Sequence, residues 1–465
     1  MSQHINLREK IGYGLGDAAS SMFWKLFSMY LLFFYTDIFG IPAVVVGTMF
    51  LITRIWDAVN DPMMGLIADR TSSRWGRFRP YILFTAIPFG VFGVLTFSSP
   101  ELSVTGKIVY AYITYTLMMM IYTCINVPYA SLLGVISSDP KQRTILSSYR
   151  MIFAFGGSIL ALVSIEPLVH LFSSSGANPQ RGWQMAVAVI ALAAVILFFL
   201  NFLWTKERVE PLKKGTNRLK DDLKDLLKNK PWWILLGAGV AALIFNSIRD
   251  GAAVYYFKYY ANSASMLSNS SSLSITTLYL VLGQAANIVG IFLIVFVANR
   301  IGKKKAYLSS MVIATLLSIS FYFIGKDSIV MVLVFQVLIS ACAGSIFPLL
   351  WSMYADIADY SEVRTGRRAT GLIFSSSSMS QKFGWTLGGA LTGWLLGYYG
   401  FQANVEQSEF AQTGIRMMLS YFPAIGALLS VLFISLYPLG EKQVKETQDK
   451  LRLLRGEGEE GKGKR

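Results

Sequence analysis

Cysteine and histidine are nearly absent from this 465-residue chain, which has two of each. Cys124 and Cys342 lie inside apolar segments, so neither a disulfide framework nor a cysteine metal site is expected. The sequence also lacks a Gly-x-Ser-x-Gly turn, a Walker phosphate loop and any metal-binding spacing of His or Cys. We therefore expect no enzymatic activity and no cofactor, and any driving force must come from an ion gradient or from the substrate's own.

Charge is also scarce, because only 15% of the residues are charged whereas 54% are hydrophobic. With a mean hydropathy of +0.48, this composition predicts a polytopic membrane protein. The first ten residues lack a short apolar core with a cleavage site, so no signal peptide is expected. The net charge of +15 resides in short loops between apolar runs, where membrane topology accounts for it without a nucleic-acid partner.

Apolar runs of about 20 residues, separated by polar loops, predict an all-α membrane protein with twelve transmembrane helices in two six-helix halves. Alternate loops carry 22 and 3 Lys and Arg residues, which puts the basic loops and both termini in the cytoplasm. The expected localisation is the cell inner membrane. The expected spans are 11–38, 43–69, 79–98, 108–136, 146–172, 182–204, 232–260, 271–298, 305–325, 328–356, 369–400 and 413–438.

The longest loop divides the spans six and six. It predicts a first half over 1–204, a central cytoplasmic loop over 205–231 with a short amphipathic helix at 219–227, a second half over 232–440 and a tail over 441–465 that is disordered at its end. An internal repeat supports the division, because the segment from Gly65 to Arg77 has an echo at 298–303, at an offset of 230 residues. Tandem six-helix halves of this kind resemble the major facilitator superfamily, where substrate binds between the halves near mid-membrane.

The prediction of function starts from one polar stretch inside the second span. Arg54, Asp57, Asn60 and Asp61 fall within one arc of a helix, and a charged side chain in hydrocarbon costs roughly 2.5–3.5 kcal/mol. Two carboxylates and an amide carbonyl at one place suit a hard cation. The alternative is a structural cluster in which Arg54 neutralises one acid.

Further polar side chains lie in other spans. They could contact a sugar, but Arg150 and Lys382 could also neutralise buried acids, Lys25 and Lys258 could extend toward an interface, and the aromatic residues could simply pack. The candidates are Asp17, Ser21 and Lys25 in span one, Tyr122, Thr123 and Asn126 in span four, Arg150 in span five, Arg249 and Asp250 in span seven, and Lys382 in span eleven.

Charged residues of the cytoplasmic loops are expected to hold the halves together in one gated state. They are Asp69, Arg70, Arg77, Asp139, Arg143, Asp356, Asp359 and Arg364.

The stretch 54–65 followed by 73–80 resembles the glycoside–pentoside–hexuronide:cation symporter family, whose best-known member is melibiose permease. Segments spread over nearly the full length agree with it, and together they are specific. They are 13–16, 34–37, 126–132, 255–257, 355–360 and 404–408.

The resemblance implies a symporter in which Asp57, Asn60, Asp61 and Thr123 hold the coupling cation, with Lys382 near that site. It also implies sugar contacts from Tyr122, Asn126, Arg150 and Phe347. Ser21 and Asn126 stand where melibiose permease has the two acids that grip its galactoside, so a different sugar is expected. Asp17, one turn from Ser21, is a candidate substitute, and Arg150 with Arg249 would suit a carboxylated sugar.

The sequence therefore predicts a monomeric secondary transporter that imports a sugar or glycoside with a monovalent cation by alternating access. Because a proton needs no neutral oxygen ligand, Asn60 favours Na⁺ over H⁺, although a carboxylate pair can bind either. A lipid or lysolipid transporter on the same scaffold is the alternative, and it would need a greasy cleft in place of polar stripes. A membrane-embedded enzyme is a third possibility, for which no nucleophile or metal cluster is visible.

Overall fold

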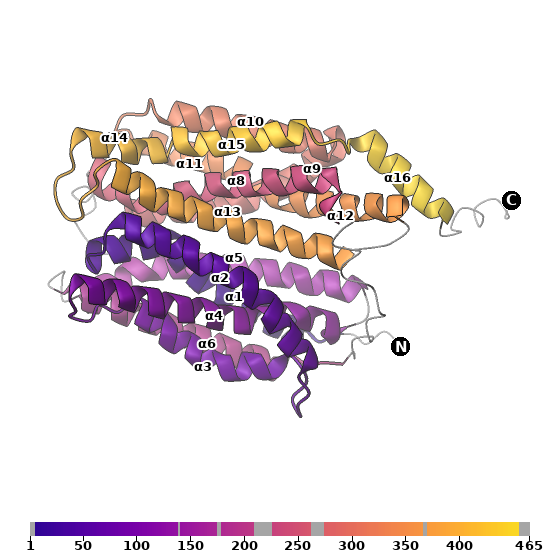
Figure 1. Cartoon of the computed structure of the whole chain (residues 1–465), viewed down its shortest axis with the longest axis horizontal. Helices are drawn as coiled ribbons and strands as arrows, with labels where there is room; N and C mark the ends of the chain where they lie inside the picture. The colour runs from indigo at the N-terminus through magenta and orange to yellow at the C-terminus, as the bar shows by residue number, and fades with distance from the viewer. Residues whose placement is uncertain are drawn as a thin grey trace. The chain divides into compact units, whose positions relative to one another are not determined.

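The computed structural model describes residues 5–137, 140–173, 178–208, 226–261, 274–365 and 370–454. Among these residues the regular elements are all helical, either α-helices or π-helical turns, written η (Figure 1). In chain order they are α1 (Leu7–Leu26), η1 (Phe27–Leu31), η2 (Phe34–Ile38), α2 (Ala43–Arg70), α3 (Arg79–Thr96), α4 (Val104–Ile136), α5 (Pro140–Phe172), α6 (Pro179–Trp204), α8 (Lys230–Tyr255), η3 (Tyr256–Tyr260), α9 (Ile275–Ile301), α10 (Lys303–Phe321), α11 (Ile329–Gly344), α12 (Ile346–Thr365), α13 (Thr370–Tyr398), α14 (Glu409–Met418), α15 (Tyr421–Ser435) and α16 (Glu441–Leu454).

The predicted all-α membrane fold with twelve spans is confirmed. Eight helical stretches of the described chain are long and apolar enough to cross a membrane on their own, among them α3 to α6. The other four spans are the first helix with its π-turns, α2, α10 and α13, which carry charged or hydroxylated residues. The expected amphipathic helix at 219–227 falls largely outside the described residues, as does the end of the tail, whereas the start of the tail forms α16.

The internal repeat is visible in how the third helix of each half begins. Gly76 and Gly302 precede α3 and α10 and have φ angles of +105° and +88°, a region that glycine enters without steric cost. A glycine with positive φ therefore stands before the third helix in both halves, although the connection is longer in the first half.

A carboxylate caps each of these helix starts. Glu207, which follows α6, accepts hydrogen bonds of 2.8–2.9 Å from the backbone N–H groups of residues 77–79. Glu441, at the start of α16, accepts one of 3.0 Å from the N–H of Lys303. An anion at a helix N-terminus satisfies orphan donors and interacts favourably with the helix dipole, so each half pins its third helix to the chain that follows its sixth.

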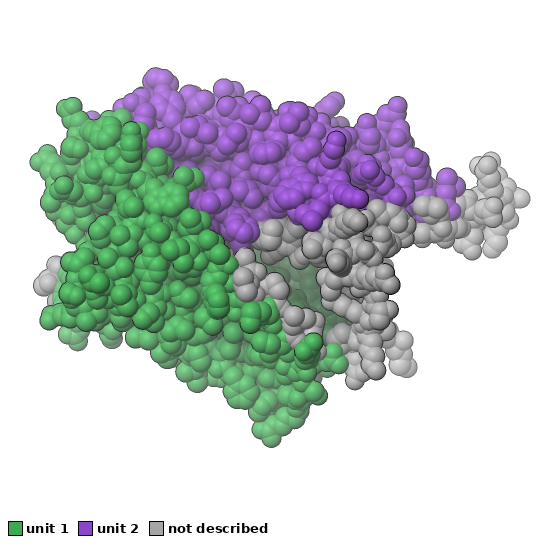
Figure 2. Space-filling view, viewed as in Figure 1, with its two compact units in different colours: residues 1–213, 250–281, 389–415 green, residues 214–249, 282–388, 416–465 purple. Residues whose placement is uncertain are grey.

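The chain forms two compact units, coloured green and purple in Figure 2. Unit 1 contains residues 1–213, 250–281 and 389–415, and unit 2 contains 214–249, 282–388 and 416–465. In unit 1, α1 packs on α5 and α6, and α3 packs on α4 and α6. In unit 2, α10 packs on α11 and α15, and α12 packs on α16. Unit 1 therefore includes all six helices of the first half together with parts of spans seven, eight, eleven and twelve.

Candidate functional site

α2 presents two chemically different faces around the predicted cation site. Ile55, Trp56 and Met63 are exposed, as expected for side chains that face lipid. Asp57, next to Trp56 in sequence, is only 1% exposed. The polar arc of α2 is therefore directed into the protein, where a carboxylate can be stabilised.

Asp61 follows Asp57 by one helical turn and connects α2 to α4. The hydroxyl of Thr123 donates a hydrogen bond of 2.8 Å to Asp61 Oδ1, and Thr123 is itself buried. Two helices thus contribute oxygen atoms to one place, with Thr123 beside the acid as the resemblance implied.

Asn60 contributes a neutral amide to the same arc. Its Nδ2 atom and the hydroxyl of Thr53 are buried, and neither makes a hydrogen bond to a residue that the structure describes. Because rotation of an amide exchanges nitrogen and oxygen, Asn60 can present Oδ1 there. Asp57, Asn60, Asp61 and Thr123 carry carboxylate, amide and hydroxyl oxygens, which are the ligand types that suit a hard cation, and their role as one cation site stays a prediction. The Arg54 side chain lies outside the described part, so its pairing with an acid stays a prediction.

A second polar cluster joins α1, α4 and α5. Nε of Arg150 lies 2.8 Å from Oδ2 of Asp17, and the arginine and aspartate side chains are 35% and 15% exposed. The Arg150 guanidinium also lies 5.4 Å above the ring of Tyr129, which packs against Tyr13. This ion pair lies against two packed aromatic rings and keeps part of its surface accessible.

Asn126, also on α4, is held by two hydrogen bonds, one of which reaches α1. Its Oδ1 accepts a bond of 2.8 Å from Ser20, and its Nδ2 donates one of 3.0 Å to the carbonyl of Tyr122. The ring of Tyr122 lies 5.9 Å from that of Trp24. Ser21 is half-buried beside Ser20. The structure thus pairs Asp17 with Arg150 and joins Asn126 to Tyr122 and to α1, whereas a common substrate site that also includes Ser21 stays a prediction.

Arg249, in contrast, lies in a buried cluster of unit 2. Its terminal nitrogens donate hydrogen bonds to the Leu419 carbonyl and, at 2.8 Å, to Oε1 of Gln336. Its guanidinium lies 5.4 Å from the centre of the Phe321 ring. These contacts hold the Arg249 side chain inside unit 2, and its role toward substrate stays a prediction. Phe347 on α12 and Lys382 on α13 are half-buried in the same unit, and their roles stay predictions.

Of the predicted gating residues, Asp356 forms an ion pair with Lys303. Lys303 Nζ lies 2.8 and 2.7 Å from the two carboxylate oxygens of Asp356, which is buried. Both residues belong to the second half, so this pair does not itself join the halves. Among the other predicted gating residues, Arg70 and Arg364 are exposed and Asp359 is half-buried. Arg77 donates its backbone N–H to Glu207. Asp139 and the side chains of Asp69 and Arg143 lie outside the described part.

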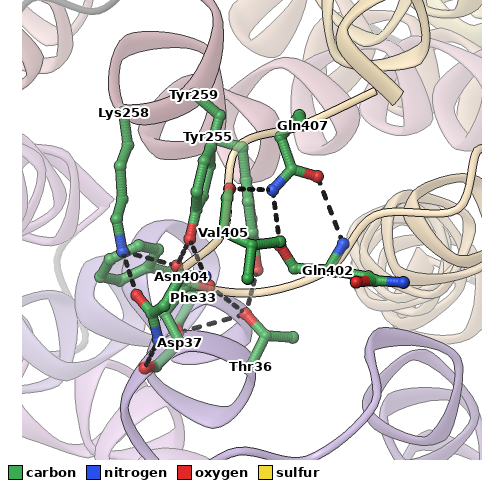
Figure 3. A network of polar contacts seen from close by, with 10 residues as sticks. All are labelled: Phe33, Thr36, Asp37, Tyr255, Lys258, Tyr259, Gln402, Asn404, Val405 and Gln407. Carbon is green, nitrogen blue, oxygen red and sulfur yellow. Dashed lines mark hydrogen bonds and ion pairs between the residues drawn. The ribbon is translucent and has the colours of Figure 1, made fainter. Parts of the chain in front are cut away.

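A polar network that the sequence did not assign to the site lies where η2 and η3 meet (Figure 3). The Asp37 side chain is completely buried, and Lys258 Nζ lies 2.7 Å from its Oδ1. The hydroxyl of Tyr259 donates to the same oxygen, and the hydroxyl of Thr36 donates to Oδ2 at 2.7 Å. Thr36 also shares a hydrogen bond of 2.8 Å with the hydroxyl of Tyr255. These five residues and Asn404 are called the Asp37 network.

Asn404 contributes a loop to this network. It has a φ of +61°, which makes it the one residue other than glycine with a positive φ in the described chain. Its Nδ2 donates to the Asp37 carbonyl at 2.6 Å, its Oδ1 accepts from Lys258 at 2.8 Å, and its backbone N–H donates to the Tyr259 hydroxyl. Gln407 holds the loop through hydrogen bonds to its backbone (Figure 3). Asn tolerates this backbone better than other non-glycine residues, and its three bonds stabilise it.

The π-turns η2 and η3 occupy equivalent places in the two halves. η2 ends the first span of the first half, and η3 ends the first span of the second half. π-turns occur frequently at functional sites. The sequence signal for this network was an acid, Asp37, and a base, Lys258, at corresponding ends of these spans. The base was given only an interfacial role, because nothing local showed that the two segments meet.

Two further contacts connect the first-half spans of unit 1 with its second-half segments. Lys25 on α1 lies 3.5 Å from Asp250 on α8, and both side chains are mostly buried. Glu166 on α5 accepts hydrogen bonds from Tyr30 at 3.2 Å and from Ser274, just before α9. Together with the Asp37 network, these contacts explain why unit 1 extends beyond the first half.

Comparison with known proteins identifies a transporter. Residues 12–441 match the family described as MFS/sugar transport protein. The chain is 38% identical over 437 residues to the inner membrane symporter YicJ of Escherichia coli, covering 94% of this chain and 92% of that protein. It is 35% identical over 445 residues to the isoprimeverose transporter of Lactiplantibacillus pentosus, covering 95% and 90% of the two chains.

The fold is also shared with solved structures. A crystal structure of a variant of the nucleoside transporter NupG superposes with a TM-score of 0.68 and 14% identity, covering 92% of this chain and all of that one. At this identity the likeness concerns the fold alone.

Proposed function

The chain belongs to the MFS/sugar transport protein family and, within it, to the glycoside–pentoside–hexuronide:cation symporters, and from this premise we propose that it imports a glycoside together with Na⁺ by alternating access. As a multi-pass symporter it is a transporter and not an enzyme. The cell inner membrane, with both termini in the cytoplasm, is the proposed setting, supported by the distribution of basic loops and by the relative YicJ.

The observation that carries the proposal is the inward polar arc of α2. The proposal is supported by the burial of Asp57 and by the Thr123–Asp61 hydrogen bond, which joins oxygen atoms of two helices. Such a site binds a small cation because the ion offsets the cost of the buried carboxylate charge. Na⁺ is proposed over H⁺ since the neutral oxygens of Asn60 and Thr123 add ligands that a proton does not use.

Coupling to the sugar follows from the geometry of α4. Thr123 and Asn126 are three residues apart and therefore neighbours on one helix face. The first lies beside Asp61, and the second is bonded to Ser20 on α1, the helix that carries Asp17. A cation that positions Thr123 also positions the sugar-binding segment of α4. The coupling is reciprocal, so sugar should tighten cation binding by the same factor.

The Asp37 network is proposed as the gate on the predicted periplasmic side. Its members come from both halves, and the contacts between them have to break before a path can open at that end. Charged, hydrogen-bonded contacts that are either all made or all solvated give the two discrete arrangements that a gate requires.

Asp57→Cys and Asp61→Cys test the cation site. Each change should abolish Na⁺-driven accumulation of sugar in proteoliposomes, while sugar equilibration down its own gradient persists. Accumulation by either variant at the unmodified level would refute the assignment. Uptake with and without Na⁺ at fixed pH distinguishes Na⁺ from H⁺.

A screen of radiolabelled sugars against lysolipids, in the same vesicles, tests the substrate class. The lipid alternative predicted a greasy cleft, whereas the cluster on α1, α4 and α5 contains an ion pair, an amide and hydroxyl groups. Movement of lysolipid without any sugar uptake would favour the alternative.

A further inference from the structure

Both arginines that the sequence marks for a carboxylated sugar are engaged by the protein itself. Arg249 directs its terminal nitrogens to Gln336 and to the Leu419 carbonyl. Arg150 pairs with the carboxylate of Asp17 at 2.8 Å. The sugar cluster therefore contains an arginine whose charge is already compensated.

This pairing affects charged and uncharged sugars differently. A sugar carboxylate next to Arg150 would either stand beside Asp17, where two like charges repel in a medium of low dielectric constant, or displace it and leave a buried acid unpaired. A sugar hydroxyl requires neither. It can donate to Asp17 and accept from the remaining N–H groups of Arg150, and the ion pair stays intact.

A base on the same face of α1 as Asp17 is also paired with an acid. Lys25 lies two turns beyond Asp17 and 3.5 Å from Asp250, and its side chain is 10% exposed. The described α1 stripe thus presents acid–base pairs at both ends, with the Ser21 hydroxyl between them. Such a stripe offers hydrogen bonds without excess positive charge.

We propose that the substrate is an uncharged glycoside and that Asp17 is a specificity residue, which excludes hexuronides by neutralising Arg150. The inference rests on the proposed function and deepens it. The relevant distinction is between sugars that share their ring hydroxyls but differ at carbon 6, which carries either a hydroxymethyl group or a carboxylate.

Transport of matched sugar pairs tests the proposal. Proteoliposomes containing the full chain are given labelled glucosides and galactosides, and separately the corresponding glucuronides and galacturonides. Uncharged members should be accumulated at least tenfold faster than their carboxylates. Accumulation of the carboxylates alone, or of both classes equally, overturns the inference but leaves the proposed symport intact. If no sugar of either class is accumulated, the proposed function itself is refuted.

Variants at the ion pair separate specificity from general damage. Asp17→Asn should raise the ratio of uronide to uncharged sugar at least tenfold, because it releases the charge of Arg150. Asp17→Glu should keep the original ratio, and the double variant D17N/R150Q should restore it by removing both charges. The same ratios can be measured on purified protein as ligand protection against thermal unfolding, so a variant that binds without transporting still reports. An unchanged ratio in Asp17→Asn contradicts the assignment.

Discussion

Thr123 is the residue that most directly connects the proposed cation and sugar sites, since its hydroxyl donates to Asp61 and its helix carries Asn126. Thr123→Val keeps the shape but removes one hydrogen bond and one oxygen donor. A loss of about 1.4 kcal/mol corresponds to a tenfold change in binding. We therefore expect the Na⁺ concentration for half-maximal uptake to rise about tenfold. Thr123→Ser should behave like the unmodified protein, and an unchanged Na⁺ dependence in Thr123→Val would exclude the hydroxyl as a ligand.

At the scale of residues, the sequence predicts buried charged groups, because the free-energy cost of burying them depends on their own helix. It misses contacts whose partners lie far away in the chain. Asp57 and Asp61 could be placed on one inward arc because helical spacing and the cost of buried charge are properties of the segment itself. Arg249 could not be assigned, because its acceptors come from residues 336 and 419 and only packing brings them near. Asp17 and Arg150 were both candidates, but their pairing needed the tertiary structure.

At the scale of elements, the two capped helix starts provide a comparison within one molecule. Glu207 accepts three backbone N–H groups at the start of α3, whereas Glu441 accepts one at the start of α10. Removing an acceptor leaves its donors unsatisfied, and each hydrogen bond that is lost costs about 0.5–1.5 kcal/mol. Glu207→Ala should lower the thermal unfolding midpoint in detergent by several degrees, and Glu441→Ala by less.

If neither change had an effect, water would be replacing the carboxylates. The opposite ranking would contradict the prediction that the number of accepted N–H groups sets the loss of stability. The Arg208 guanidinium should stay charged in both variants, because its hydrogen bonds to Glu9 raise its pKa further above the working range. Glu9→Gln is therefore a separate perturbation of the same region, and it acts on α1 instead of α3.

The observed helix boundaries agree closely with the predicted ones where hydropathy defines the span, and the twelve spans appear in the predicted order. The π-turns η2 and η3 were not predicted, because apolar periodicity does not distinguish a π-turn from an α-helix at the end of a span. The tail was also only partly anticipated. Its first residues form α16 because Glu441 and Leu451 have partners in the fold.

At the scale of the whole molecule, the repeat gives each half a first span that ends in a π-turn, and transport requires the contacts between such segments to form and break. Asp37 and Lys258 lie 221 positions apart in the chain, so no window of the sequence could pair them. Their charges are opposite and their segments equivalent. This makes the Asp37 network testable by exchanging the two charges.

Lys258→Met should weaken the closed state of the predicted periplasmic gate, because it leaves the buried Asp37 carboxylate without its cation. The readout is Ser21→Cys, in a background with Cys124 and Cys342 replaced by alanine, labelled by a membrane-impermeant thiol reagent from outside. We expect labelling at least fivefold faster than in the parent. Asp37→Lys should have a similar or larger effect, and the exchange D37K/K258D should bring the rate back toward the parent because the pair is restored in reverse.

Lys107→Met is the matched control, since Lys107 donates to the Phe39 carbonyl within the first half. A double variant as accessible as Asp37→Lys alone, or an equal effect of Lys107→Met, would mean that this end of the protein is closed by packing and not by the ion pair.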